Sequence, residues 1–207
     1  MTDQPRLLSP RRIEAFSDGV FAIAATLLVL DLSVDHLGSI SSNDQLWRAL
    51  GDISESLISF VISFLLLCML WMVHTRQFEY ITRVDDTVLW LNSLRLLGVV
   101  LIPFTTSVNA DFSELLLGRV VLPLNFLWVL VLDWALWRYV TTSPRGLLGE
   151  ISDDELRASS GRALGAVITG IVVLVLAPFI GSWAFLAFAV SALLGAGRSL
   201  GRGRRRG

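Results

Sequence analysis

The chain has 207 residues, of which 54% are hydrophobic and 17% are charged, and its mean hydropathy is +0.66. A soluble domain carries about 25% charged residues, so this composition excludes an ordinary soluble domain and predicts an all-α protein that crosses a membrane several times. The formal net charge is -1, all 17 basic residues are arginines, and the single cysteine, Cys68, has no partner for an intrachain disulfide.

The first predicted span, residues 12–33, carries ionisable groups into an otherwise apolar helix. Asp18 lies about 9 Å beyond Arg12 at 1.5 Å per helical residue. A carboxylate in hydrocarbon costs free energy unless it is paired, and the candidate partners are Arg12, His74 and Arg95. We expect a structural network that holds three helices in register, in preference to a direct contact with an ion.

A second feature of this span is a stripe on one helical face. Gly19, Ile23, Thr26 and Leu30 are separated by four, three and four residues, which places them on the same side of a helix. A packed helix shows the same periodicity, and a threonine hydroxyl can bond to its own backbone. The spacing alone therefore leaves open whether the stripe lines a pore or packs against a neighbour.

Further apolar segments of spanning length follow the first. They cover residues 53–75, 87–107, 115–139, 163–180 and 183–197, which makes six spans in total. Polar connections are expected at 34–50, a turn-rich loop, and at 141–160, where Ser152 and Glu155 have the spacing of a helix capping box.

Charge along the chain predicts the orientation. With six spans both termini lie on one side, and fourteen of the 17 arginines fall on that side, against Arg48 and Arg119 on the other and Arg95 within the third span. The positive-inside rule then puts both termini in the cytoplasm of a multi-pass plasma-membrane protein. The opposite side is acidic, which either raises the local cation concentration or simply reflects the exclusion of arginine from translocated loops.

Hydrolytic chemistry is the first alternative to be weighed. Ser17, Asp18 and His74 have the residue types of a hydrolytic triad, but Ser17 and Asp18 point about 100° apart on a helix and no oxyanion motif accompanies them. The sequence also contains no nucleotide-binding, metal-ligand or nucleic-acid motif, so no enzyme, no cofactor and no nucleic-acid partner is expected.

Arg95 and Asp133 lie in adjacent antiparallel spans and are expected to share one network.

One motif is more specific than these patterns. The first span reads Arg12-xxx-Phe16-Ser17-Asp18 and then Ala22-Ile23-xx-Thr26-Leu27-Leu28; Trp71-xx-His74 and Asn92, Arg95 and Pro103-Phe104 follow in the second and third spans. This set resembles the bacterial, single-repeat form of the transmembrane protein 175 family of potassium channels. The filter sequence Thr-Val-Gly-Tyr-Gly of ordinary potassium channels is absent from the chain, as it is from that family.

The resemblance implies a potassium-selective channel that conducts down the electrochemical gradient. It implies a homotetramer in a lipid bilayer, with four first helices around a central pore and residues 1–207 as one six-helix domain. An N-terminal arm (1–11) and a basic tail (198–207) would be cytoplasmic. Ile23 would form the hydrophobic constriction, Thr26 would shape selectivity and Leu30 would form a further ring. The network that sets the pore helix would consist of Arg12, Phe16, Ser17, Asp18, Trp71, His74 and Arg95.

Two other functions stay open on the residues themselves. Asp18 and His74 have the chemistry of a proton relay in a small secondary transporter. A histidine that titrates near neutral pH is also compatible with a proton-permeable channel. Apart from permeant potassium, none of these readings needs a bound metal.

Overall fold

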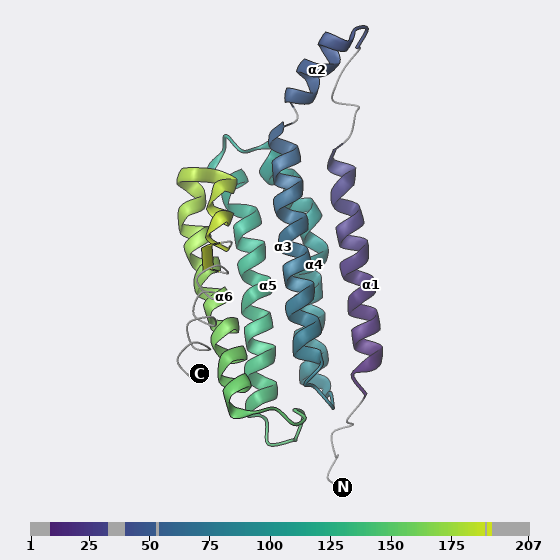
Figure 1. Ribbon diagram of the computed structural model, residues 1–207, viewed down its shortest axis with the longest axis vertical. Coiled ribbons are helices and arrows are strands. Elements are labelled where there is room, and N and C mark those ends of the chain that lie inside the picture. Colours follow the sequence, from purple (N-terminus) through teal and green to yellow (C-terminus); the bar gives the residue numbers. More distant parts are fainter. Residues whose placement is uncertain (1–8, 33–39, 53, 189, 192–207) are drawn as a thin grey trace, which may run out of the picture.

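The computed structural model describes residues 9–32, 40–52, 54–188 and 190–191, and it shows an elongated bundle of nearly parallel helices (Figure 1). The long helices are α1 (Arg11–Leu27), α3 (Ser54–Phe78), α4 (Asp86–Asp111), α5 (Leu116–Thr142) and α6 (Asp153–Ile180). Five segments among the described residues are long and apolar enough to cross a membrane. The chain is therefore an all-helical integral membrane protein, as its composition predicts.

Most helix ends lie within a few residues of the predicted spans, but α6 is an exception. It begins at Asp153, whereas the predicted span began at 163, so residues 153–160 belong to a helix and not to a loop. The Ser152 hydroxyl accepts the backbone N–H of Glu155 at 3.3 Å, which confirms the expected capping box. The helix therefore starts at its cap, ten residues before the chain becomes apolar.

A second correction concerns the connection that was expected to be a loop at 34–50. Part of it forms a short amphipathic helix, α2 (Asn43–Asp52), which projects beyond the bundle in Figure 1. The Ser42 hydroxyl accepts the backbone N–H of Gln45 at 3.2 Å, and the Gln45 side chain accepts the N–H of Ser41 at 2.9 Å. The first contact is a serine N-cap and the second reaches the residue before the cap, so the start signal was present in the polar sequence.

The chain reverses direction after α6. Gly181 has a φ of 57°, in the left-handed region that glycine adopts most easily, and begins the short helix η3 (Gly181–Phe185). Phe185 then packs back onto Phe126 of α5, with ring centroids 5.5 Å apart. Of the predicted sixth span, residues 183–197, the structure describes 183–188 and 190–191, and the rest lies outside the described residues.

Helix α4 is the centre of the bundle, because α1, α3 and α5 all pack against it. Its buried side chains include Val99 and Ile102, which meet Phe21 of α1, Leu67 of α3 and Phe126 of α5 in one apolar core. The tight contact of α4 with α5 brings a backbone carbonyl within reach of a side chain on the facing helix. The Asn125 amide donates to the carbonyl of Gly98 at 3.1 Å, so this buried polar group is satisfied.

The connection between α3 and α4 is tied to the connection between α5 and α6. Ile81 and Leu148 form an isolated β-bridge. On either side of it, the N–H of Thr82 donates to the Leu147 carbonyl at 3.0 Å and that of Gly149 donates to the Tyr80 carbonyl at 2.8 Å. The two connections therefore close this end of the bundle as one unit.

Candidate functional site

Helix α1 has two opposite faces. The residues buried against the rest of the chain are Ser17, Phe21 and Ala24, and Leu28 continues this face into the 3₁₀ turn η1 (Leu28–Asp31). At 100° per residue these positions point in nearly one direction. One face of α1 thus makes its contacts with α3 and α4.

The predicted stripe occupies the other face of this helix. Gly19, Ile23, Thr26 and Leu30 are all exposed, and Ile23 and Leu30 are 61% and 68% exposed. By helical geometry their mean direction is about 200° from that of the buried face. The Thr26 hydroxyl donates to the Ile23 carbonyl at 2.9 Å. Its proton is therefore engaged, while the lone pairs of its oxygen remain on the exposed side.

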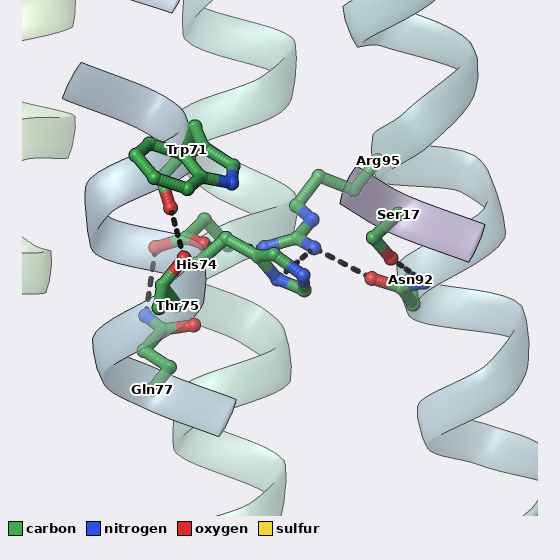
Figure 2. A network of polar contacts seen from close by, with 8 residues as sticks. Ser17, Trp71, His74, Thr75, Gln77, Asn92 and Arg95 are labelled. Atoms are coloured by element: carbon green, nitrogen blue, oxygen red, sulfur yellow. Dashed lines mark hydrogen bonds and ion pairs between the residues drawn. The ribbon is translucent and has the colours of Figure 1, made fainter. Parts of the chain in front are cut away.

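A polar network lies behind the buried face of α1 (Figure 2). At its centre is Arg95 of α4, which is 1% exposed. One guanidinium nitrogen is 3.0 Å from a carboxylate oxygen of Asp133 on α5. The other donates to the Asn92 side-chain carbonyl at 2.6 Å and lies 2.6 Å from Nδ1 of His74 on α3. Arg95 thereby joins three helices, and Arg95 and Asp133 share one network, as expected.

The contact with Arg95 also fixes the state of the histidine ring. A guanidinium has only donors, so Nδ1 of His74 accepts, and a neutral His74 carries its proton on Nε2. The ring lies 5.8 Å from that of Phe21 and 4.3 Å from that of Phe78, measured between centroids. Nε2 has no hydrogen-bond partner within the part of the chain that the structure describes. His74 therefore packs between two aromatic rings, and within the described residues only its Nδ1 atom is hydrogen-bonded.

Two further contacts extend the network to both sides. The Asn92 amide donates to the Ser17 hydroxyl of α1 at 3.2 Å, which connects the first helix to α4. The Gln77 amide donates to the second carboxylate oxygen of Asp133 at 2.8 Å. Sequence reasoning did not single out Gln77, although a polar residue three positions after His74 shares a helical face with it.

Asp18 has a different partner from those expected. The indole N–H of Trp71 on α3 donates to its carboxylate at 2.9 Å, and none of the three predicted partners bonds to it. Arg12 is exposed and makes no hydrogen bond or ion pair with another described residue. Asp18 is exposed and lies one residue beyond buried Ser17. Its carboxylate therefore reaches the indole of the partly exposed Trp71 and not the buried guanidinium of Arg95. Phe16 is 64% exposed and contributes no polar contact.

A separate ion pair stabilises the end of the bundle where α3 and α4 are connected. Asp85 caps α4 by accepting the N–H of Val88 at 3.0 Å, and it also accepts from Tyr139 at 2.7 Å and Arg145 at 2.5 Å. Burial by itself would raise the pKa of Asp85, but these hydrogen bonds and the guanidinium charge outweigh it and lower the pKa below its usual value.

The arrangement does not suit hydrolysis or metal binding. Ser17 bonds to Asn92, and His74 bonds to Arg95. The described contacts therefore do not pair Ser17 as a nucleophile with His74 as its base. No group of three His, Cys, Asp or Glu side chains suited to a metal occurs within the described residues. What the geometry provides is a rigid polar support behind α1 and an unpaired face in front of it.

Comparison with known proteins identifies this arrangement. Residues 12–103 match the family model described as endosomal/lysosomal potassium channel TMEM175. A potassium channel of Streptomyces collinus is 35% identical over 156 residues, which cover 73% of this chain and 72% of that protein. The chain belongs to the TMEM175 family.

Other TMEM175 proteins extend the comparison to structure and to vertebrates. The crystal structure of a lysosomal potassium-selective channel TMEM175 homolog from Chamaesiphon minutus has a TM-score of 0.71 and 28% identity, covering 91% of this chain and 95% of that one. The endosomal/lysosomal proton channel TMEM175 of Gallus gallus is 34% identical over 112 residues, which cover 52% of this chain but only 22% of that protein. The resemblance in the first-span motif is thus confirmed at the level of family and fold.

Proposed function

We propose that this chain is the subunit of a potassium-selective channel that conducts ions down their electrochemical gradient. Its family membership and the names of its bacterial relatives support the proposal. The observation that carries it is the asymmetry of α1, whose buried face makes the contacts with its own subunit. The opposite face, with Ile23, Thr26 and Leu30, is left free for an axis shared with other copies.

In this proposal four copies assemble as a homotetramer with four α1 helices around a central pore. Ile23 would then form a ring of four branched apolar side chains. Such a ring opposes hydrated ions because water leaves a narrow hydrophobic constriction, and small rotations of α1 would open or close it. Leu30, seven residues further along the same face, would form a second ring.

Thr26 would supply oxygen ligands next to the constriction. Because its hydroxyl proton bonds to the Ile23 carbonyl at 2.9 Å, each copy presents an oxygen with free lone pairs. Four such oxygens would replace part of the hydration shell of a potassium ion, which is the general way in which a filter discriminates between cations.

The polar network would set the position of the pore helix. Ser17 and Asp18 attach α1 to Asn92 and Trp71. Arg95, which also contacts His74, holds Asn92 in place. Two of the proposed members, Arg12 and Phe16, are exposed in the single chain and would act between copies. Asp18→Asn should lower the yield of tetramer in size-exclusion chromatography, whereas normal assembly with altered current would point to direct contact of Asp18 with ions.

The proposal includes six spans per subunit, with residues 1–207 as one channel domain in the plasma membrane. Both termini, including the arm 1–11 and the tail 198–207, would face the cytoplasm. The distribution of arginines supports this orientation, because most of them fall on the side of the termini. Labelling of intact cells with a membrane-impermeant thiol reagent tests this orientation. Single cysteines introduced in α2 should react, and single cysteines introduced near Ser143 should not.

Currents through purified protein in planar bilayers test the pore assignment. Ile23→Asn should raise the basal conductance, because a polar ring stays hydrated, while Ile23→Val should not. Thr26→Val should lower the potassium over sodium permeability ratio about fivefold, on the order of 1 kcal/mol of lost oxygen coordination, while Thr26→Ser keeps it. Wild-type conductance and selectivity in both Ile23→Asn and Thr26→Val would refute the assignment.

A second candidate function is proton permeation, since TMEM175 of Gallus gallus is named a proton channel. In this chain Asp18 bonds to Trp71, and His74 bonds to Arg95. No described contact therefore joins Asp18 and His74 into a proton relay. The same observation disfavours a proton-coupled transporter. Reversal potentials measured in pH gradients decide between the ions. A shift that follows the proton gradient would favour protons, and flux that saturates with substrate would favour a transporter.

A further inference from the structure

A cavity of about 320 Å³ lies at the end of the bundle where α6 ends, in the upper part of Figure 1. Its walls come from α3, from the turn between α4 and α5, and from the turn between α6 and η3. Neither the stripe of α1 nor the network around Arg95 contributes to it. The cavity therefore has no part in the proposed pore.

One wall of the cavity carries an arginine with unused hydrogen-bond donors. Nε of Arg119 donates to the Ser113 carbonyl at 2.5 Å and Nη1 donates to the Pro178 carbonyl at 3.1 Å. These contacts with neutral acceptors fix the orientation of the guanidinium without cancelling its charge. A guanidinium has five N–H donors, so the others are available to a ligand.

The nearest acid is placed beside this arginine and not on it. A carboxylate oxygen of Glu114 lies 4.0 Å from Nη2 of Arg119, beyond hydrogen-bond distance, and the Glu114 side chain is 92% exposed. A positive and a negative group therefore stand next to each other at the mouth of the cavity, each with capacity for a partner of opposite charge.

The floor of the cavity is polar and held in place. Asn109 donates to the Gly118 carbonyl at 2.9 Å and accepts from the Ser182 hydroxyl at 2.8 Å, so it joins three of the surrounding segments. Ser59 of α3 also lines the cavity and is only 5% exposed.

The rim of the cavity is apolar and faces outward. Phe179 is 78% exposed, Trp183 is 60% exposed and Ile180 is 47% exposed. In an integral membrane protein such side chains meet lipid, and tryptophan in particular is enriched at the boundary between hydrocarbon and headgroups. A ligand that matches both floor and rim must have a polar, charged end and a hydrocarbon end.

We propose that this cavity binds one membrane phospholipid with an amine-bearing headgroup, of the phosphatidylethanolamine type. The phosphate accepts hydrogen bonds from the free donors of Arg119, and the ammonium group lies against Glu114. An acyl chain runs along Phe179 and Trp183. A phosphatidylglycerol headgroup offers the same phosphate but no cation, so Glu114 disfavours it.

Native mass spectrometry of the full-length protein in detergent, titrated with palmitoyl-oleoyl phosphatidylethanolamine or phosphatidylglycerol, tests this site. The wild type should bind the ethanolamine lipid about fivefold more tightly, the value of one exposed charge pair. Glu114→Gln should remove this preference, and Arg119→Gln should weaken both lipids about tenfold. Arg48→Gln on α2 is the matched control and should change neither affinity.

Arg119 also holds two backbone carbonyls, so its variant is checked by thermal unfolding. If it does not fold, Glu114→Gln decides alone, because that side chain is exposed and makes only the long contact with Arg119. Equal wild-type affinity for the two lipids, or an unchanged preference in Glu114→Gln, would overturn the proposal. Binding of soluble phosphoethanolamine as tight as that of the lipid would also overturn it, since the apolar rim would then contribute nothing.

Discussion

Replacement of Asp133 by Asn should destabilise the bundle strongly. Asp133 is 6% exposed and Arg95 is 1% exposed, so neither charge is hydrated, and the two are joined at 3.0 Å. In Asp133→Asn the guanidinium has no anionic partner, because Asn92, His74 and the new amide are all neutral acceptors. Loss of one partner from a buried ion pair costs about 3–5 kcal/mol, because the remaining charge stays in the interior without compensation.

The assay is the free energy of unfolding in mixed micelles, followed by tryptophan fluorescence. Asp44→Asn on the exposed surface of α2 is the matched control and should change stability by less than about 0.5 kcal/mol. A double variant, Arg95→Met with Asp133→Leu, removes both charges. Its loss of unfolding free energy should be at least about 2 kcal/mol smaller than the summed losses of Arg95→Met alone and Asp133→Leu alone. A loss below about 1 kcal/mol in Asp133→Asn, or strict additivity, would refute the reasoning.

Two further predictions concern the ends of the helices. The pKa of Asp85 is lowered in the folded state, so the stability it contributes is present above its unfolded pKa and is lost as pH falls through the lower folded value; Asp85→Asn should flatten the dependence of the melting temperature on pH below about 5. In Gly118→Ala the new Cβ would meet the Phe112 carbonyl oxygen and should cost about 1–3 kcal/mol of unfolding free energy or more, whereas Gly165→Ala on α6, where a Cβ meets nothing within 4 Å, should not destabilise. Equal melting temperatures for the two alanine variants would contradict the close approach at Gly118.

The sequence alone was sufficient to predict the helical membrane architecture. A run of about 20 apolar residues satisfies its backbone hydrogen bonds within one helix, so composition along the chain decides where a span lies without reference to any other segment. The spacing of Ile23, Thr26 and Leu30 likewise fixed that they share one face of α1. The first-span motif was specific enough to indicate the TMEM175 family, which the comparisons confirm.

Helix ends depended on short-range contacts that composition does not report. The helix α2 and the early start of α6 both follow from serine caps in polar stretches, at Ser42 and Ser152. Each cap satisfies a free backbone N–H, which stabilises a helix start by about 1 kcal/mol regardless of hydropathy. Boundaries predicted from apolar runs therefore missed ten residues of α6 and the whole of α2.

Only the tertiary structure decided which polar side chains meet. Asp18 was expected to pair with Arg12, His74 or Arg95, but it bonds to Trp71, while Arg95 pairs with Asp133. The sequence places each residue on a face of its own helix, and these choices depend on how the helices are rotated and displaced relative to one another. That rotation is set by the packing of apolar side chains over the whole bundle, because each buried polar group must find its partner within the few ångströms that packing allows.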